Sequence, residues 1–243
     1  MEERRGLSLY RYVYSALLED ILGGKYKVGC VLPSEKDLEQ RFSVSRITIR
    51  RAVDDLQKDN IVLKQPGIGT LVLDNKIPLQ LSGISGFRDE NTHLSEWTSS
   101  ILISCKKIHP ALKVRTALQL NGSTLVYCLE RIRLLKNERV GFHRAYFPES
   151  IVTIPEGYFS HEKASLYDLF KAKDLYPYKA HERISAILPS DEIVRYLKID
   201  KNLPVLFKER QTFSKENRPI EFVEVYYRGD RYQYEVQIVD SRN

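Results

Sequence analysis

Cysteine and histidine are scarce in this sequence. Its 243 residues include three cysteines and five histidines. No two cysteines have a C-x-x-C spacing, and no two histidines have the i, i+4 spacing that places two imidazoles on one helix face. The sequence therefore predicts reduced cysteines, no disulfide framework, no metal site and no cofactor. These residues are Cys30, Cys105, Cys128, His93, His109, His143, His161 and His181.

Long apolar runs are absent as well. No stretch approaches the roughly 18 apolar residues that span a bilayer. Residues 1–9 are charged where a signal peptide has its apolar core. We therefore expect a cytoplasmic protein that does not associate with membranes. A content of 42% hydrophobic and 29% charged residues suffices for two modest cores.

The basic excess is spread over the chain. Residues 1–75 hold 12 basic and 11 acidic residues, and the remainder holds 26 and 21. The net charge of +6 therefore does not by itself indicate nucleic-acid binding. Residues 41–51, however, hold four arginines and no acid. The alternative is that this cluster is only a solvated helix face. The setting of the cluster, that is, the predicted elements around it, distinguishes this alternative from DNA binding.

That setting is three predicted helices followed by a hairpin. Apolar residues at helical spacing from Leu9 to Ile21 end at Gly23-Gly24. Ser34 is placed to cap a short second helix, and Ser45 to cap a third. Two short strands, residues 61–64 and 70–73, then flank a glycine-containing turn.

A short helix, a tight turn and a helix with basic and hydroxylated residues at its start are typical of a helix-turn-helix. In that motif the last helix enters the major groove, where arginine donates two hydrogen bonds to guanine. Serine and threonine hydroxyls bind phosphate oxygens. The hairpin that follows is interpreted as a wing. The outer face of the third helix carries Arg46, Thr48, Arg50 and Arg51.

These residues resemble the GntR regulators, in particular their HutC-like branch. The matching positions are Leu9-Tyr10, Leu32-Pro33-Ser34-Glu35, Leu38, Phe42, Val44-Ser45-Arg46, Thr48, Arg50, Ala52, Leu56 and Gly67-Ile68-Gly69-Thr70. The resemblance, with the cap and helix-face positions, predicts a DNA-contacting set of Ser34, Lys36, Ser45, Arg46, Thr48, Arg50, Arg51 and Gly67. The family often has a basic residue where this chain has Ile68, so its wing differs.

The second part of the chain changes to strands. We expect a winged helix-turn-helix domain over residues 1–74, a linker over 75–79 and a second domain over 80–243. The second domain is predicted to be α+β with a mainly antiparallel sheet. The predicted strands are 101–108, 124–135, 140–147, 179–188, 205–213, 220–228 and 233–239. The predicted helices are 111–118, 165–171 and 191–197.

This part is similar to the UTRA effector-binding domain, which is related in fold to chorismate lyase. The landmarks are Gly86-Phe87, Glu130 to Leu134, Tyr146-Phe147-Pro148, Ser165 to Leu169, Pro204-Val205-Leu206, Pro219-Ile220-Glu221 and Tyr227 to Tyr232. The resemblance implies that this domain binds a small molecule and forms a homodimer.

Arg131 and Arg133 are two residues apart on a predicted strand, so both side chains project from one face. Such a pair suits a phosphate or a carboxylate. Solvation, or pairing with acids across the sheet, is the alternative. The resemblance implies an effector site here. Two positions depart from relatives that bind phosphorylated sugars: this chain has Arg88-Asp89 where they tend to have small hydroxyl residues, and His143 where they often have a glutamate. An effector other than an amino-sugar phosphate is therefore an alternative. The predicted effector-binding set is Phe87, Arg88, Asp89, Arg131, Arg133, His143, Ser165, Tyr167, Glu221 and Tyr227.

Residues 227–232 have a purely structural alternative. In it, Asp230 and Arg231 pair in a turn and the tyrosines pack in the core.

The sequence therefore predicts a sequence-specific, DNA-binding transcription regulator. It is expected to be a homodimeric repressor, released from a pseudo-palindromic double-stranded DNA operator by a small anionic metabolite, in the first place a sugar phosphate. A regulator with a carboxylate effector, an enzyme of the chorismate-lyase type and a nonspecific architectural DNA binder are the alternatives. No catalytic constellation is visible in the sequence.

Overall fold

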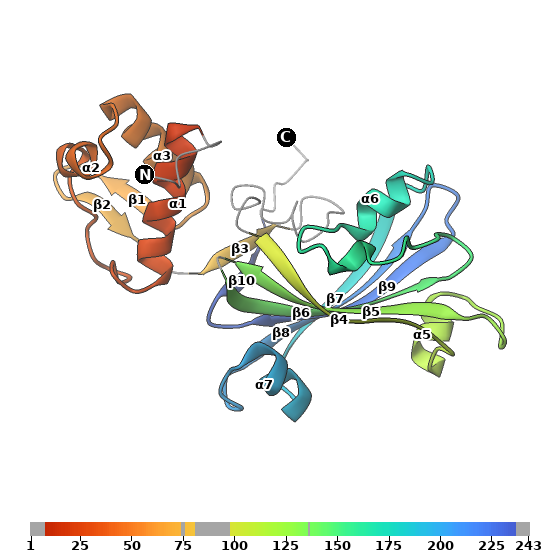
Figure 1. Ribbon diagram of the computed structural model, residues 1–243. Coiled ribbons are helices and arrows are strands. Elements are labelled where there is room, and N and C mark those ends of the chain that lie inside the picture. Colours follow the sequence, from red (N-terminus) through yellow and green to blue (C-terminus); the bar gives the residue numbers. More distant parts are fainter. Residues whose placement is uncertain (1–7, 74–75, 81–97, 136, 237–243) are drawn as a thin grey trace, which may run out of the picture. The chain divides into compact units, whose positions relative to one another are not determined.

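The computed structural model describes residues 8–73, 76–80, 98–135 and 137–236 (Figure 1). The chain forms two compact units, Met1–Pro78 and Leu79–Asn243. Each unit is described by itself below. Among the described residues no helix is both long and apolar enough to cross a membrane. Those residues also contain no group of three His, Cys, Asp or Glu side chains that could hold a metal ion.

The first unit consists of three helices and a two-stranded sheet. The elements are α1 (Leu9–Leu22), α2 (Glu35–Phe42), α3 (Arg46–Lys58), β1 (Val62–Gln65) and β2 (Gly69–Val72). Val13, Leu17 and Ile21 of α1 are fully buried, as are Ile49 and Leu56 of α3. The predicted apolar stripes therefore form the core between these helices.

Capping residues fix where α2 and α3 begin. Ser34 and Asp37 form a reciprocal capping box at the start of α2. The Ser45 hydroxyl accepts a hydrogen bond from the backbone N–H of Thr48 at the start of α3. Between the helices Ser43 adopts a left-handed conformation with φ of 51°. The turn is tight because this residue ends α2 and redirects the chain at once.

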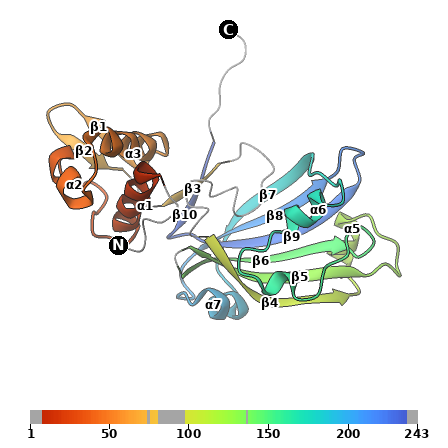
Figure 2. The same ribbon diagram turned by 45° about the horizontal axis from the view of Figure 1, so that its top comes forward.

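The second unit is built on a six-stranded antiparallel sheet with the strand order β4-β5-β6-β9-β8-β7. Figure 2 shows the strands in this order. The strands are β4 (Thr98–Ile108), β5 (Val126–Leu135), β6 (Glu138–Pro148), β7 (Lys179–Ile187), β8 (Val205–Phe213) and β9 (Pro219–Arg228). The predicted fold class and all six strands of this sheet are confirmed, with ends that differ from the predicted ones by at most three residues.

Helices cover both faces of this sheet. On one face α7 (Asp191–Leu197) packs on Ile132 and Phe142, and α5 (Leu112–Ala117) packs on Val126. On the other face lie α6 (Leu166–Lys171) and a short 3-10 helix, η3 (Tyr158–Ser160) (Figure 1). Because successive side chains of a strand point to opposite faces, the strands of this sheet contact helices on both of its sides.

One strand was not predicted. Residues Ile77–Gln80 form β3, which pairs with β10 (Tyr232–Glu235). The sequence had indicated a linker here because Pro78 interrupts a strand pattern, but proline is tolerated in an edge strand. The predicted strand 233–239 begins one residue earlier than expected, and its residues 237–239 lie outside the described part of the chain.

Candidate DNA-binding and effector sites

The exposed face of α3 gathers four of the predicted DNA contacts. Arg46 and Arg50 are one turn apart, and both donate through Nε to the carboxylate of Glu35 at the start of α2. The hydroxyls of Ser45 and Thr48 are 2.9 Å apart at the helix start. The side chains of Arg46 and Arg50 are 60% and 53% exposed, so they are accessible to a ligand.

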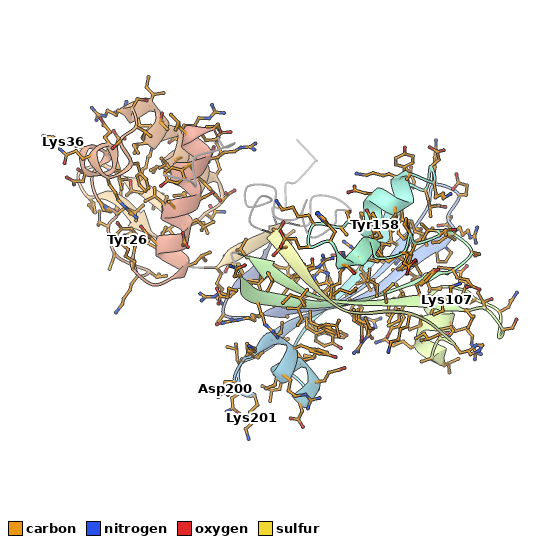
Figure 3. All side chains as sticks on the ribbon, viewed as in Figure 1. Tyr26, Lys36, Lys107, Tyr158, Asp200 and Lys201 are labelled. Carbon is orange, nitrogen blue, oxygen red and sulfur yellow. The ribbon has the colours of Figure 1, made fainter. Side chains whose placement is uncertain are left out.

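The other predicted DNA contacts lie around this face. The Arg51 guanidinium lies 3.7 Å from the centre of the Tyr10 ring of α1 and makes a cation–π contact with it. The Lys36 side chain is exposed and projects from α2 (Figure 3). Ser34 serves as the cap of α2. Gly67 turns the chain between β1 and β2 with φ of 76°, a conformation that favours glycine.

A cavity of about 80 Å³ lies between the sheet of the second unit and the segment 162–168. Tyr158 precedes this segment and donates a hydrogen bond to the Ser165 carbonyl (Figure 3). Ser165 lines the cavity and caps α6 by accepting a hydrogen bond from the Asp168 N–H. The predicted effector residues that line the cavity are Arg131, Arg133, His143, Ser165, Tyr167 and Glu221.

The sheet register explains why these side chains converge. Arg131 pairs with His143, His143 with Val225, and Val225 with Lys208, so the four residues form one row across β5, β6, β9 and β8. The outer strands of this row are separated by three strand spacings, about 14 Å. The row therefore places a cation on each outer strand and an uncharged floor between them.

The two predicted arginines hydrogen-bond to neutral groups. Arg131 Nη1 donates to the Ala164 carbonyl at 2.7 Å, and Arg133 Nη1 donates to the Ser100 hydroxyl at 2.6 Å. Glu130, which precedes Arg131 on β5, accepts hydrogen bonds from Arg144 and Ser104. Both guanidinium groups belong to side chains that line the cavity.

Lys208 and Arg210 of β8 add two more cations that sequence reasoning missed. Both are almost fully buried and both line the cavity. Each lies 3.5 Å from a carboxylate oxygen of Glu182, and Arg210 lies 3.9 Å from Glu221. The signal was present, because two cations spaced i, i+2 on the predicted strand 205–213 resemble the pair on β5.

This concentration of positive charge changes the acid–base behaviour of the site. The pKa of His143 lies well below its usual value because the ring is buried and because Arg133, Arg131, Lys208 and Arg210 surround it. Burial, and next the neighbouring Arg133, lower the pKa of Arg131. A neutral imidazole therefore lies in the floor of a cationic cavity.

Glu221 lies at the centre of a hydrogen-bonded group on the same floor. One of its carboxylate oxygens accepts a hydrogen bond from the Tyr167 hydroxyl at 3.0 Å and one from the Thr212 hydroxyl at 3.1 Å. Burial, and next the Glu221 carboxylate, raise the pKa of Tyr167. The phenol therefore keeps its proton and acts as a donor.

Tyr227 differs from the expectation that it lines the cavity. Its ring is fully buried and lies edge-on to His143, with 5.4 Å between ring centres. It also packs on Tyr232 at 4.6 Å. Gly141 makes room for it, since a Cβ there would lie 2.9 Å from the ring. Tyr227 therefore lies beside the cavity residues on the same face of the sheet and packs against His143 without lining the cavity.

The turn after β9 bears on the structural alternative for residues 227–232. Asp230 pairs with Arg228 at 2.7 Å, whereas Arg231 pairs with Glu138 at 2.9 Å. The Asp230–Arg231 pair of that alternative is therefore replaced by two separate ion pairs, while Tyr227 and Tyr232 are buried as the alternative states. Phe87, Arg88 and Asp89 lie outside the described residues.

Comparison with known proteins identifies both units. The family described as "Bacterial regulatory proteins, gntR family" matches residues 9–72, and the UTRA domain matches residues 96–233. The transcriptional regulator GgaR of Escherichia coli is 27% identical over 88% of this chain and 84% of its own. The transcriptional repressor NagR of Bacillus subtilis is 24% identical over 94% and 93%.

A solved structure shares the fold. The crystal structure of PhnF from Mycobacterium smegmatis superimposes with a TM-score of 0.63 and 24% sequence identity, over 95% of this chain and all of that one.

Proposed function

Because the chain belongs to the GntR family of bacterial regulatory proteins and carries a UTRA domain, we propose that it is a homodimeric repressor whose effector is a small anionic metabolite, in the first place a phosphorylated sugar. As a member of this family the chain is a DNA-binding transcription regulator rather than an enzyme. To this family function the proposal adds four points: the protein represses, it is a dimer, its effector is an anionic metabolite, and named residues bind the DNA and the effector. NagR, a similar protein, is named a repressor.

The observation that carries the proposed effector class is the charge of the cavity. Arg131, Arg133, Lys208 and Arg210 are all less than a tenth exposed. Burying a cation away from water is costly unless an anion compensates it. Glu182 lies 3.5 Å from Lys208 and from Arg210, and Glu221 lies 3.9 Å from Arg210. Four cations around one small cavity favour an anionic ligand such as a phosphate monoester.

The neighbouring polar groups fit the rest of a sugar phosphate. Glu221 can accept hydrogen bonds from sugar hydroxyls, while the protonated Tyr167 can donate one. We assign the phosphate to Arg131 and Arg133, because a guanidinium pair binds a phosphate through paired N–H donors. The hydroxyl of Ser165 lies at the same end of the cavity and adds a donor.

The operator is proposed to be a pseudo-palindrome. A symmetric dimer presents two α3 helices, which fit half-sites separated by one helical turn of DNA, about 10 base pairs, or a multiple of it. The proposed DNA contacts are those predicted from the sequence. The proposed domains are residues 1–74 and 80–243, joined by residues 75–79.

A thermal-shift screen tests the effector class. The purified protein is heated with sugar phosphates, with their unphosphorylated parent sugars and with small carboxylates. We expect one phosphate ester to raise Tm while its parent sugar does not. Arg133→Ala should remove the shift, whereas Arg139→Ala should retain it, because Arg139 lies on β6 outside the cavity and donates to the Tyr196 carbonyl.

The carboxylates separate the second candidate from the first. A shift produced by a carboxylate and removed by Arg133→Ala would replace the sugar phosphate with a carboxylate effector, which paired arginines also suit. A shift that survives Arg133→Ala would place the ligand elsewhere and overturn the assignment of the cavity.

A further inference from the structure

Glu35 connects two exposed arginines of α3, Arg46 and Arg50. Its carboxylate accepts a hydrogen bond from Arg46 Nε at 2.7 Å and from Arg50 Nε at 3.0 Å. The two arginines are spaced i, i+4, so their side chains leave the helix on the same face. Glu35 is the first residue of α2, where the Ser34–Asp37 capping box fixes its backbone. One carboxylate on a second element thus holds both guanidinium groups side by side.

These bonds leave the outer ends of both side chains for a partner. A guanidinium carries five N–H donors, and the bonds to Glu35 engage Nε alone. The two amino groups of each arginine form the fork that matches O6 and N7 of guanine. A fork that is oriented before DNA arrives loses less side-chain entropy on binding.

Stability does not account for this arrangement. Both arginines are more than half exposed, and ion pairs at such positions contribute little to folding. The hydrogen bonds from Arg46 and Arg50 hold the pKa of Glu35 below its usual value, against the opposing effect of partial burial. The group is therefore a fixed anion, placed where a DNA-binding surface otherwise gains from positive charge.

We infer that Glu35 is a positioning residue for specificity: it orients Arg46 and Arg50 toward base edges and withholds them from phosphates. This inference rests on the proposed DNA contacts of Arg46 and Arg50. A mobile arginine binds any phosphate that it reaches, which raises affinity for all DNA. An arginine held by a carboxylate binds well only where a base offers the matching acceptors. Glu35 therefore lowers nonspecific affinity and raises the ratio of operator to nonspecific affinity.

The test compares Glu35→Gln with Glu39→Gln. Both variants remove one negative charge from α2, and Glu39 also lies near Arg46, but the structure gives a hydrogen bond to Arg46 for Glu35 only. The operator is the sequence that the wild-type protein enriches from a random DNA library. Dissociation constants for this operator and for scrambled DNA of equal length are measured at one salt concentration.

We expect both variants to bind scrambled DNA a few-fold more tightly than the wild type. The ratio of operator to scrambled affinity should fall at least 10-fold in Glu35→Gln and less than 2-fold in Glu39→Gln. Repeating the library selection with Glu35→Gln should relax the base preference at the positions that Arg46→Ala and Arg50→Ala also relax. A change in folding alone would lower both affinities together and leave the base preference intact.

Two outcomes overturn different statements. If Arg46→Ala and Arg50→Ala retain operator affinity, the proposed DNA contacts are wrong. If these variants lose affinity while Glu35→Gln keeps the same ratio as Glu39→Gln, the contacts stand and the positioning role of Glu35 is wrong. Circular dichroism at the assay temperature confirms that every variant is folded.

Discussion

His143 illustrates at the scale of one residue how the cavity is prepared for an anion. The side chains that face it are Arg131 and Arg133 from β5, Lys208 and Arg210 from β8, and the Tyr227 ring from β9. A protonated imidazole here would be a fifth buried cation. His143 is therefore neutral in the folded protein, and this makes the stability of the protein depend on pH.

The effector-free protein should lose stability as the pH falls below about 6.5, the ordinary pKa of histidine. The pKa of His143 is lowered by folding, so below 6.5 the unfolded chain binds a proton that the folded chain does not. Stability is fully present above 6.5 and declines toward the folded pKa, with a loss of about 1.4 kcal/mol by pH 5.5.

Chemical denaturation at pH 7.5 and pH 5.5 measures this loss. His143→Asn removes the titrating group. Between pH 7.5 and pH 5.5 the variant should therefore lose about 1.4 kcal/mol less stability than the wild type. Equal slopes for the two proteins would show that His143 takes up its proton over the same pH range in the folded and unfolded states.

At the scale of the element, a buried hydrogen bond joins α1 to the end of α3. The Tyr14 hydroxyl donates to Asp59 Oδ2, which immediately follows α3. Both residues are buried, and burial, together with the nearby Asp59 carboxylate, raises the pKa of Tyr14. The phenol thus stays protonated and serves as a donor to a buried carboxylate at any ordinary pH.

Tyr14→Phe should lower the free energy of unfolding by about 1–3 kcal/mol, because the buried carboxylate loses a donor. Tyr10→Phe is the matched control on the same helix. Its hydroxyl accepts an exposed hydrogen bond from Arg11, and its ring, which carries the contact with Arg51, is retained. We expect less than about 0.5 kcal/mol for this control. Equal effects of the two substitutions, measured by urea denaturation, would contradict the role given to the Tyr14–Asp59 bond.

Elements defined by local signals were predictable from the sequence. The helix starts followed from Ser34 and Ser45, whose side chains cap the next turn, and the strands followed from runs of β-branched and aromatic residues. The strand β3 escaped prediction because its pairing partner, β10, is about 150 residues away.

The candidate site was predictable only in part for the same reason. Arg131 and Arg133 are two residues apart in the sequence and could be recognised as a pair. That Lys208 and Arg210 face them depends on the strand order, which places β6 and β9 between β5 and β8. The i, i+2 spacing shows which side chains share a face of one strand, whereas the cavity is formed by side chains from several strands. The pairing of Asp230 with Arg228 depended similarly on side-chain geometry in a turn.

At the scale of the whole molecule, regulation requires that the two proposed sites influence each other. We expect the effector to lower operator affinity by about 5- to 150-fold, the range of an allosteric coupling of about 1–3 kcal/mol. Thermodynamic linkage requires operator DNA to lower effector affinity by the same factor.

Two titrations measure this coupling. Operator binding is followed with and without saturating effector, and effector binding is followed with and without operator. Unequal factors would indicate a third binding process, and a factor of one in both titrations would overturn the proposed mechanism. Arg133→Ala should bind the operator normally and no longer respond to the effector.

The strand order of the second unit also bears on how this unit folds. Strands β4, β5 and β6 form one meander and β7, β8 and β9 form another, and the two are joined at the β6–β9 pairing, which connects residues some 80 positions apart. Contacts between distant residues form late in folding, because closing a long loop costs entropy first. The cavity lies across this joint, and each half brings its own pair of cations. When the two halves come together, the cations of one half approach those of the other and repel them. An anion bound between the two pairs reduces that repulsion. A bound effector should therefore slow unfolding as well as stabilise the fold, so the same molecule that signals to the regulator prolongs the lifetime of its folded state.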